Sequence, residues 1–217
     1  MTGSLSSVVS SADSDVDADS PADSPGDSDS DGAGRPPLAA SPIPVRYHRA
    51  LLTLAATTGV VTFWAACTWM SLHLHADPLL HRVALFAHLA SLVLGFGTVL
   101  VIDYHGLLWL IGRRSLPDTV QGTAALHAPV WLGVGGLLLT GTLLHPDPTA
   151  PLTQVKLLLV LVIALNGVHA TALHHRLADL GHRSPATGLL MRGGASAVVS
   201  QISWWGAVVI GFLNSRR

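Results

Sequence analysis

The feature that most constrains this chain is a run of 29 residues from Val83 to Ile111, VALFAHLASLVLGFGTVLVIDYHGLLWLI. It contains no Lys or Arg, although Arg82, Arg113 and Arg114 stand just outside it. A helix rises about 1.5 Å per residue, and about 20 apolar residues are enough to cross the ~30 Å hydrocarbon core of a bilayer. The run therefore predicts a transmembrane helix with length to spare.

The composition of the whole chain agrees with this class. Hydrophobic residues make up 49% of the sequence and charged residues only 12%, whereas soluble domains carry about 25% charged residues. Four further apolar segments are separated by polar or proline-rich loops. We expect an all-α integral membrane protein, a bundle of about five transmembrane helices at about residues 50–72, 83–111, 124–144, 152–173 and 194–213.

A polar tail precedes this transmembrane domain, which we place at residues 46–217. Residues 1–45 are mostly Ser, Asp, Ala, Pro and Gly, and eight of the thirteen acidic residues lie between Asp13 and Asp31. A segment of this kind has too little apolar surface to offset the entropy of ordering, so we expect a disordered acidic tail. From Arg35 onward, twelve Lys and Arg face five Asp. This basic balance suits contact with an anionic lipid bilayer, and nothing in the chain indicates a nucleic-acid partner.

The loop charges predict an orientation. Cytoplasmic loops carry an excess of Lys and Arg. An N-terminus inside places eight bases in the cytoplasm: Arg35, Arg46, Arg49, Arg113, Arg114, Arg176, Arg183 and Arg192. Four bases are left outside: Arg82, Lys156, Arg216 and Arg217. The absence of Glu and the preference for Arg over Lys are typical of a GC-rich bacterial genome. Together with the loop charges, this composition leads us to expect a multi-pass protein of the cell (inner) membrane with a cytoplasmic N-terminus.

Small residues indicate close helix packing. Ala87, Ser91 and Gly95 recur every four residues on one helix face, and the third span contains Gly133, Gly135, Gly136 and Gly141. Small side chains let helix backbones approach closely in lipid, where packing rather than hydrophobicity drives association.

Histidine is the main chemical signal, with twelve residues against one Lys. Ionisable side chains at membrane depth are costly and often mark function, and imidazole is the commonest nitrogen ligand of haem, copper and zinc. We expect His105, His127 and His169 to act as inner ligands, and His88 and His145 as outer ligands, of haem b or copper. For a copper ion the candidates are His88, His105, His127 and His169. Asn166 would hydrogen-bond to a ligand.

Helical geometry limits these sets. Asp103 and His105 are two residues apart and point in roughly opposite directions, so at most one of them faces the bundle interior. Asn166 and His169 share a face, as do His127 and His145, which lie five turns apart.

Part of the pattern resembles a group of small bacterial membrane proteins that includes the copper-resistance CopD domain and the HemJ-type protoporphyrinogen oxidases. The resemblance rests on His88 followed by Gly95 and Gly97, on Tyr104–His105, and on a later span that opens with Lys156–Leu157 and closes on His169. It covers about residues 83–175, and the Trp usual after the first His is missing. It implies a haem- or copper-handling role for His88 and His169.

We therefore expect a His-ligated haem b or copper protein in electron transfer or metal handling, with a membrane redox complex as partner. The alternative is a non-redox transporter subunit or a structural partner of a membrane complex, in which the histidines make helix–helix contacts or relay protons. The sequence has no nucleophile–base or phosphate-loop motif, so it leaves any enzymatic activity undecided.

Overall fold

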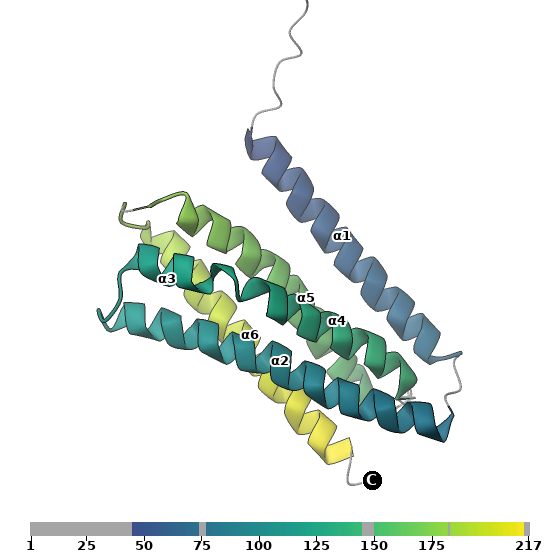
Figure 1. Cartoon of the computed structure of the whole chain (residues 1–217). Helices are drawn as coiled ribbons and strands as arrows, with labels where there is room; N and C mark the ends of the chain where they lie inside the picture. Colours follow the sequence, from purple (N-terminus) through teal and green to yellow (C-terminus); the bar gives the residue numbers. More distant parts are fainter. Residues whose placement is uncertain (1–44, 74–76, 145–149, 182, 215–217) are drawn as a thin grey trace, which may run out of the picture. The chain divides into compact units, whose positions relative to one another are not determined.

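The computed structural model describes residues 45–73, 77–144, 150–181 and 183–214, and within these residues all regular structure is helical. The expected disordered tail, residues 1–45, lies almost wholly outside the described residues. Figure 1 shows the arrangement of the helices. They are α1 (Val45–Ser71), α2 (Pro78–Leu110), α3 (Leu116–Ala124), α4 (His127–Leu143), α5 (Pro151–Ala178) and α6 (Thr187–Asn214).

The expected class, an all-α membrane protein, is confirmed. The helices α1, α2, α5 and α6 are each long and apolar enough to cross a membrane, and the bent pair of α3 and α4 passes the same test when its two helices are taken together, which gives four or five candidate spans. The protein is therefore a multi-pass membrane protein. The helices extend beyond most of the ranges expected from hydropathy, because polar residues at their ends continue the helix past the hydrocarbon core. The second span, for example, begins at Pro78 rather than at Val83.

The third span differs most from the expectation of one helix at 124–144. It begins at Leu116 and bends by 46° between α3 and α4. Pro129 explains the position of the bend. It has no N–H to donate to the carbonyl of Ala125, four residues earlier, and its ring crowds that carbonyl.

The turn between α2 and α3 is also determined by residues within the turn itself. Gly112 adopts a φ of +74°, a left-handed conformation that glycine reaches without steric cost and that ends α2. Ser115 then caps α3, since its hydroxyl accepts a hydrogen bond from the backbone N–H of Asp118. Two antiparallel helices are thereby joined by a tight loop.

The helices α2 and α4 pack in direct backbone contact. A Cβ atom added to Gly133 would lie closer to the Cα of Gly95 than non-bonded atoms can approach, and 2.8 Å from the carbonyl oxygen of Ser91. A Cβ on Gly136 would overlap the hydroxyl of Ser91. The expected close approach of these small residues is confirmed for Ser91, Gly95, Gly133 and Gly136.

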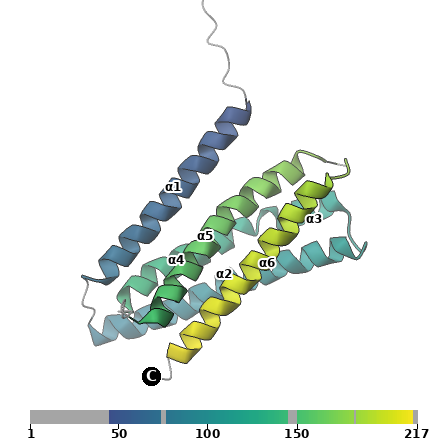
Figure 2. The same ribbon diagram turned by 180° about the vertical axis from the view of Figure 1, so that it is seen from behind.

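The core lies where α4, α5 and α6 meet the middle of α2. Trp204 of α6 is its largest fully buried side chain, at 1% exposure, and it packs with Val99, Val134 and Ala164. Seen from both sides in Figure 1 and Figure 2, α6 crosses the bundle obliquely rather than running parallel to α2.

Helix α1 lies at the edge of the bundle, against α4 and α5. The indole N–H of Trp64 donates to the carbonyl of Leu157 at 3.1 Å. Near its beginning, Arg49 forms an exposed ion pair with Asp179, which follows α5. The hydrogen bond from Arg49 holds the pKa of the Asp179 carboxyl below its usual value. The pair shows that the start of α1 and the end of α5 lie at the same end of the bundle.

We predict that Gly133→Ala destabilises the protein by about 1 to 3 kcal/mol, because overpacking forces α2 and α4 apart. Thermal unfolding of the detergent-solubilised protein measures the effect. Gly135→Ala is the matched control on the same helix, since a Cβ there meets nothing within 4 Å. Equal stability of the two variants would contradict the close contact of α2 and α4.

Candidate functional site

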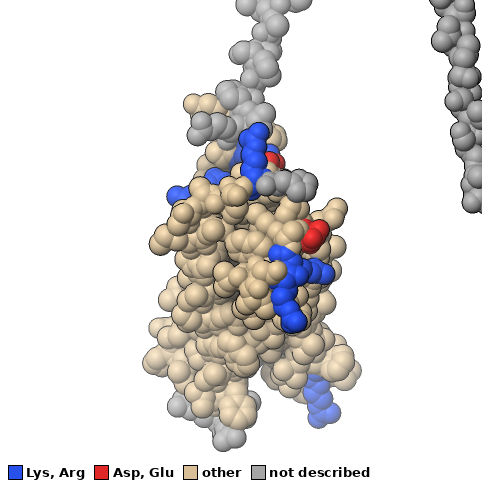
Figure 3. Space-filling model, turned by 90° about the vertical axis from the view of Figure 1, so that its left-hand side faces the viewer, with Lys and Arg blue, Asp and Glu red and all other residues tan. Residues whose placement is uncertain are grey.

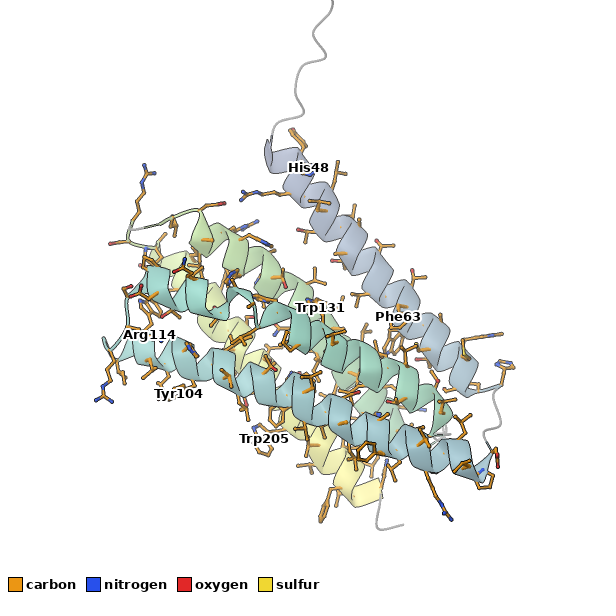
Figure 4. The ribbon with its side chains drawn as sticks, in the orientation of Figure 1. His48, Phe63, Tyr104, Arg114, Trp131 and Trp205 are labelled. Atoms are coloured by element: carbon orange, nitrogen blue, oxygen red, sulfur yellow. The ribbon has the colours of Figure 1, made fainter. Side chains whose placement is uncertain are left out.

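A chamber of about 720 Å³ opens among α2, α3, α4, α5 and α6. Its size falls in the range of small-molecule sites, about 300 to 1,000 Å³. Most of its lining is apolar, from residues such as Val99, Val134, Ile163 and Trp204. Trp131 of α4, labelled in Figure 4, lies against Gly167 of α5, where an added Cβ would stand 3.3 Å from the indole ring. The chamber suits a bulky apolar ligand.

The pairing of the helices determines the position of the chamber. Helices α2 and α4 are drawn together by their small residues, while α5 and α6 form a second close pair. The bend at Ala125–Leu126 carries α3 along α2 and brings Leu116, Thr119 and Thr123 to the chamber wall. The chamber thus lies between two tight pairs, towards the end where α2 finishes and α6 begins.

Two imidazoles face each other at the chamber wall. His127, the first residue of α4, and His174 of α5 have ring centroids 4.6 Å apart in an edge-to-face arrangement. Both rings are half-buried and both line the chamber. His174 was not among the ligands expected from the sequence. The signal that could have found it is its helical spacing, because Gly167, Ala170 and His174 follow one another at intervals of three and four and all line the chamber.

The inner set of His105, His127 and His169 is not assembled around the chamber. Of the three, only His127 lines it. His169 is exposed on α5. His105 forms a hydrogen bond through Nδ1 with the carbonyl of Val101 at 2.8 Å and lies near Gly122 of α3.

Asp103 is the member of the Asp103–His105 pair that faces the interior. Its carboxylate lines the chamber and accepts a hydrogen bond of 2.6 Å from the amide of Gln201 on α6. The Gln201 side-chain oxygen in turn accepts from the indole N–H of Trp205 at 3.1 Å. A carboxyl group at this depth is thereby hydrogen-bonded on the α6 side.

Asn166 joins α5 to α6. Its amide donates to the backbone carbonyl of Ser196 at 3.0 Å, and its oxygen accepts from the Ser196 hydroxyl at 2.9 Å. The sequence suggested that Asn166 would hydrogen-bond to a histidine ligand, but the partner found in the structure is Ser196.

The outer His88 has a defined hydrogen-bond partner on α4. Its Nδ1 lies 2.9 Å from the hydroxyl of Thr140. That hydroxyl already donates to the carbonyl of Gly136 at 2.5 Å, so it can only accept from His88. Nδ1 therefore carries a proton and donates it to Thr140. The other expected outer ligand, His145, lies outside the described residues.

His88 borders a second cavity of about 90 Å³, which it shares with Lys156, Cys67 and several hydroxyl groups. The ammonium of Lys156 is half-buried and lies near Gly211, in the last turn of α6, where helix carbonyls favour a cation. This volume is far below that of small-molecule sites and holds a few water molecules at most. In the described conformation it has no room for a porphyrin.

Within the described residues, no group of three or more His, Cys, Asp or Glu side chains is arranged to hold a metal ion. Charged side chains gather at one end of the bundle, which Figure 3 shows face on as blue and red groups on an otherwise uncharged surface. At this end the guanidinium of Arg114 lies over α3, 3.3 Å from the position of a Cβ on Gly122.

No protein-family model, no curated protein and no solved structure matches this chain.

We predict that Asn166→Ala destabilises the packing of α5 against α6 by about 0.6 to 1.7 kcal/mol, the range of hydrogen bonds between membrane helices. A double-mutant cycle with Ser196→Ala, followed by unfolding in detergent, measures the coupling. Thr171→Ala is the control, because the Thr171 hydroxyl donates only within α5, to Gly167. A coupling of zero would contradict the hydrogen bond between the Asn166 and Ser196 side chains.

Proposed function

We propose that this protein binds haem b in the chamber and serves in electron transfer in the cell membrane. The observation that carries the proposal is the position of His127 and His174 on the wall of an apolar space of about 720 Å³. A porphyrin is flat and largely apolar, and bundles hold such groups between facing helices through histidine ligands.

The ligand chemistry favours haem over a bare copper ion. A copper site needs several protein ligands, and none of the described residues form a group of three. Haem supplies four nitrogens of its own and needs only one or two from the protein. A single well-placed imidazole is then sufficient.

The spacing of the pair favours one axial ligand rather than two. Metal–imidazole bonds are about 2 Å long, so imidazoles on opposite faces of a haem have centroids roughly 6 Å apart. His127 and His174 are at 4.6 Å and approach edge to face. We therefore assign one of them to the iron and the other to orienting the ligand ring or the bound group.

The charged end of the bundle supports both the anchoring of haem and the orientation of the protein. The chamber reaches Leu116 and Leu177 at the end that also carries Arg113, Arg114 and Arg176. Arginine is well suited to pair with carboxylates such as the haem propionates. By the positive-inside rule, the same arginines favour a cytoplasmic position for this end of the bundle, where α1 begins.

We expect the detergent-purified protein to show a Soret band, and an α-band on reduction with dithionite, with about one haem per chain. Of His127→Ala and His174→Ala, the variant that removes the axial ligand should lower the bound haem at least tenfold, because the iron then has no protein ligand, and the other variant should lower it less. His175→Ala is the control, since this neighbouring residue is exposed and does not line the chamber.

Haem retained by the variant lacking both His127 and His174 would contradict the assignment of the ligand. A colourless protein without metal, with its helices intact, would contradict haem binding and favour a transporter subunit or a structural partner of a membrane complex. Stoichiometric copper without haem would move the function to metal handling.

A further inference from the structure

The chamber has an opening, and its position follows from exposure. The exposed large side chains that line the chamber come only from α2 and α6: Leu107 (52%), Leu110 (73%), Leu190 (36%), Val198 (57%) and Ile202 (65%). The lining residues contributed by α3, α4 and α5 are all buried or half-buried. The chamber is therefore closed on the side of α3, α4 and α5 and open between α2 and α6.

The side chains that frame this opening suit contact with hydrocarbon rather than with water. Helices α2 and α6 are both membrane spans, and the side chains that frame the opening are Leu, Ile and Val. Figure 4 shows Tyr104 of α2 and Trp205 of α6 on the same outer surface of the bundle, and both are more than half exposed.

The two helices touch at one side of the opening. Phe96 of α2 stacks on Trp204 at 5.5 Å between centroids and meets the edge of Trp205 at 5.1 Å. About two turns further along α2, the hydrogen bond from Gln201 to Asp103 links the helices again. Beyond this link towards the end of α2, the exposed leucines mark the part of the wall where α2 and α6 separate.

We propose that the chamber exchanges its ligand laterally with the bilayer, through the opening between α2 and α6, and that the Asp103–Gln201 hydrogen bond is the latch of this opening. The ligand class is then a bulky apolar molecule dissolved in the membrane. Lateral exchange spares such a molecule the cost of exposing its apolar surface to water. The route for haem rests on the function proposed above, whereas the direction of the opening does not.

The direction of the opening is tested without reference to haem. A spin label at Ala197→Cys, a half-buried lining position of α6, is placed in a Cys67→Ala background and reconstituted in vesicles. We expect high collisional accessibility to molecular oxygen, which partitions into hydrocarbon, and low accessibility to a water-soluble nickel complex. The label at Ser200→Cys repeats the measurement at a second lining position. The reverse accessibility at both positions would overturn the proposal.

The latch and the route are tested by the release of haem from reconstituted holoprotein to excess apomyoglobin, followed by absorption. We expect Ile202→Trp, which narrows the opening, to slow release at least fivefold. Val209→Trp is the matched control, because it lies two turns further on the same helix, is similarly exposed and does not line the chamber.

Gln201→Leu should speed release about threefold to tenfold, as expected for the loss of one hydrogen bond between membrane helices. Thr98→Val serves as its control, since the Thr98 hydroxyl bonds only within α2, to Leu94. Unchanged release rates in Ile202→Trp and Gln201→Leu would overturn the proposed opening and its latch while leaving haem binding intact. Protein without haem would contradict the proposed function, and the spin-label accessibility would still decide the direction of the opening.

Discussion

The backbone contact between α2 and α4 is the constraint on which the rest of the structure depends. In lipid, apolar side chains gain little by leaving the solvent, so helices associate where their surfaces fit closely. Ser91 and Gly95 of α2 pack against Gly133 and Gly136 of α4. The helices are so close that no larger side chain fits at either glycine of α4. This contact fixes α4, and α4 in turn positions α3, His127 and the wall of the chamber.

The chamber is a consequence of unequal packing. Helices α2 and α4 form one close pair and α5 and α6 another, while Pro129 bends the span that runs between them. The space that remains is closed by α3, α4 and α5 and bordered by a polar link between α2 and α6. The arrangement that creates the chamber therefore also leaves one side of the chamber open to the bilayer.

The polar groups inside the spans divide into two kinds. Asn166 and Ser196 are joined by two hydrogen bonds and hold helices together. His127, His174 and Asp103 keep part of their hydrogen-bonding capacity facing the chamber. Because a polar group at membrane depth is costly when it has no partner, the second kind is where ligand chemistry is expected, and the first kind is structural.

The sequence by itself determined the helical class, the presence of four or five spans and the close approach of the small residues, because hydropathy, length and residue size act locally. It also limited the interior-facing members of Asp103 and His105 to at most one, since residues two apart on a helix point in roughly opposite directions. The partners of the histidines were decided by the tertiary structure alone. His169 faces outward and His174 meets His127, because the rotation of α5 about its axis is set by the hydrogen bonds of Asn166 to Ser196 of α6 and by the packing of Trp131 of α4 against Gly167. No spacing within a single span encodes this rotation.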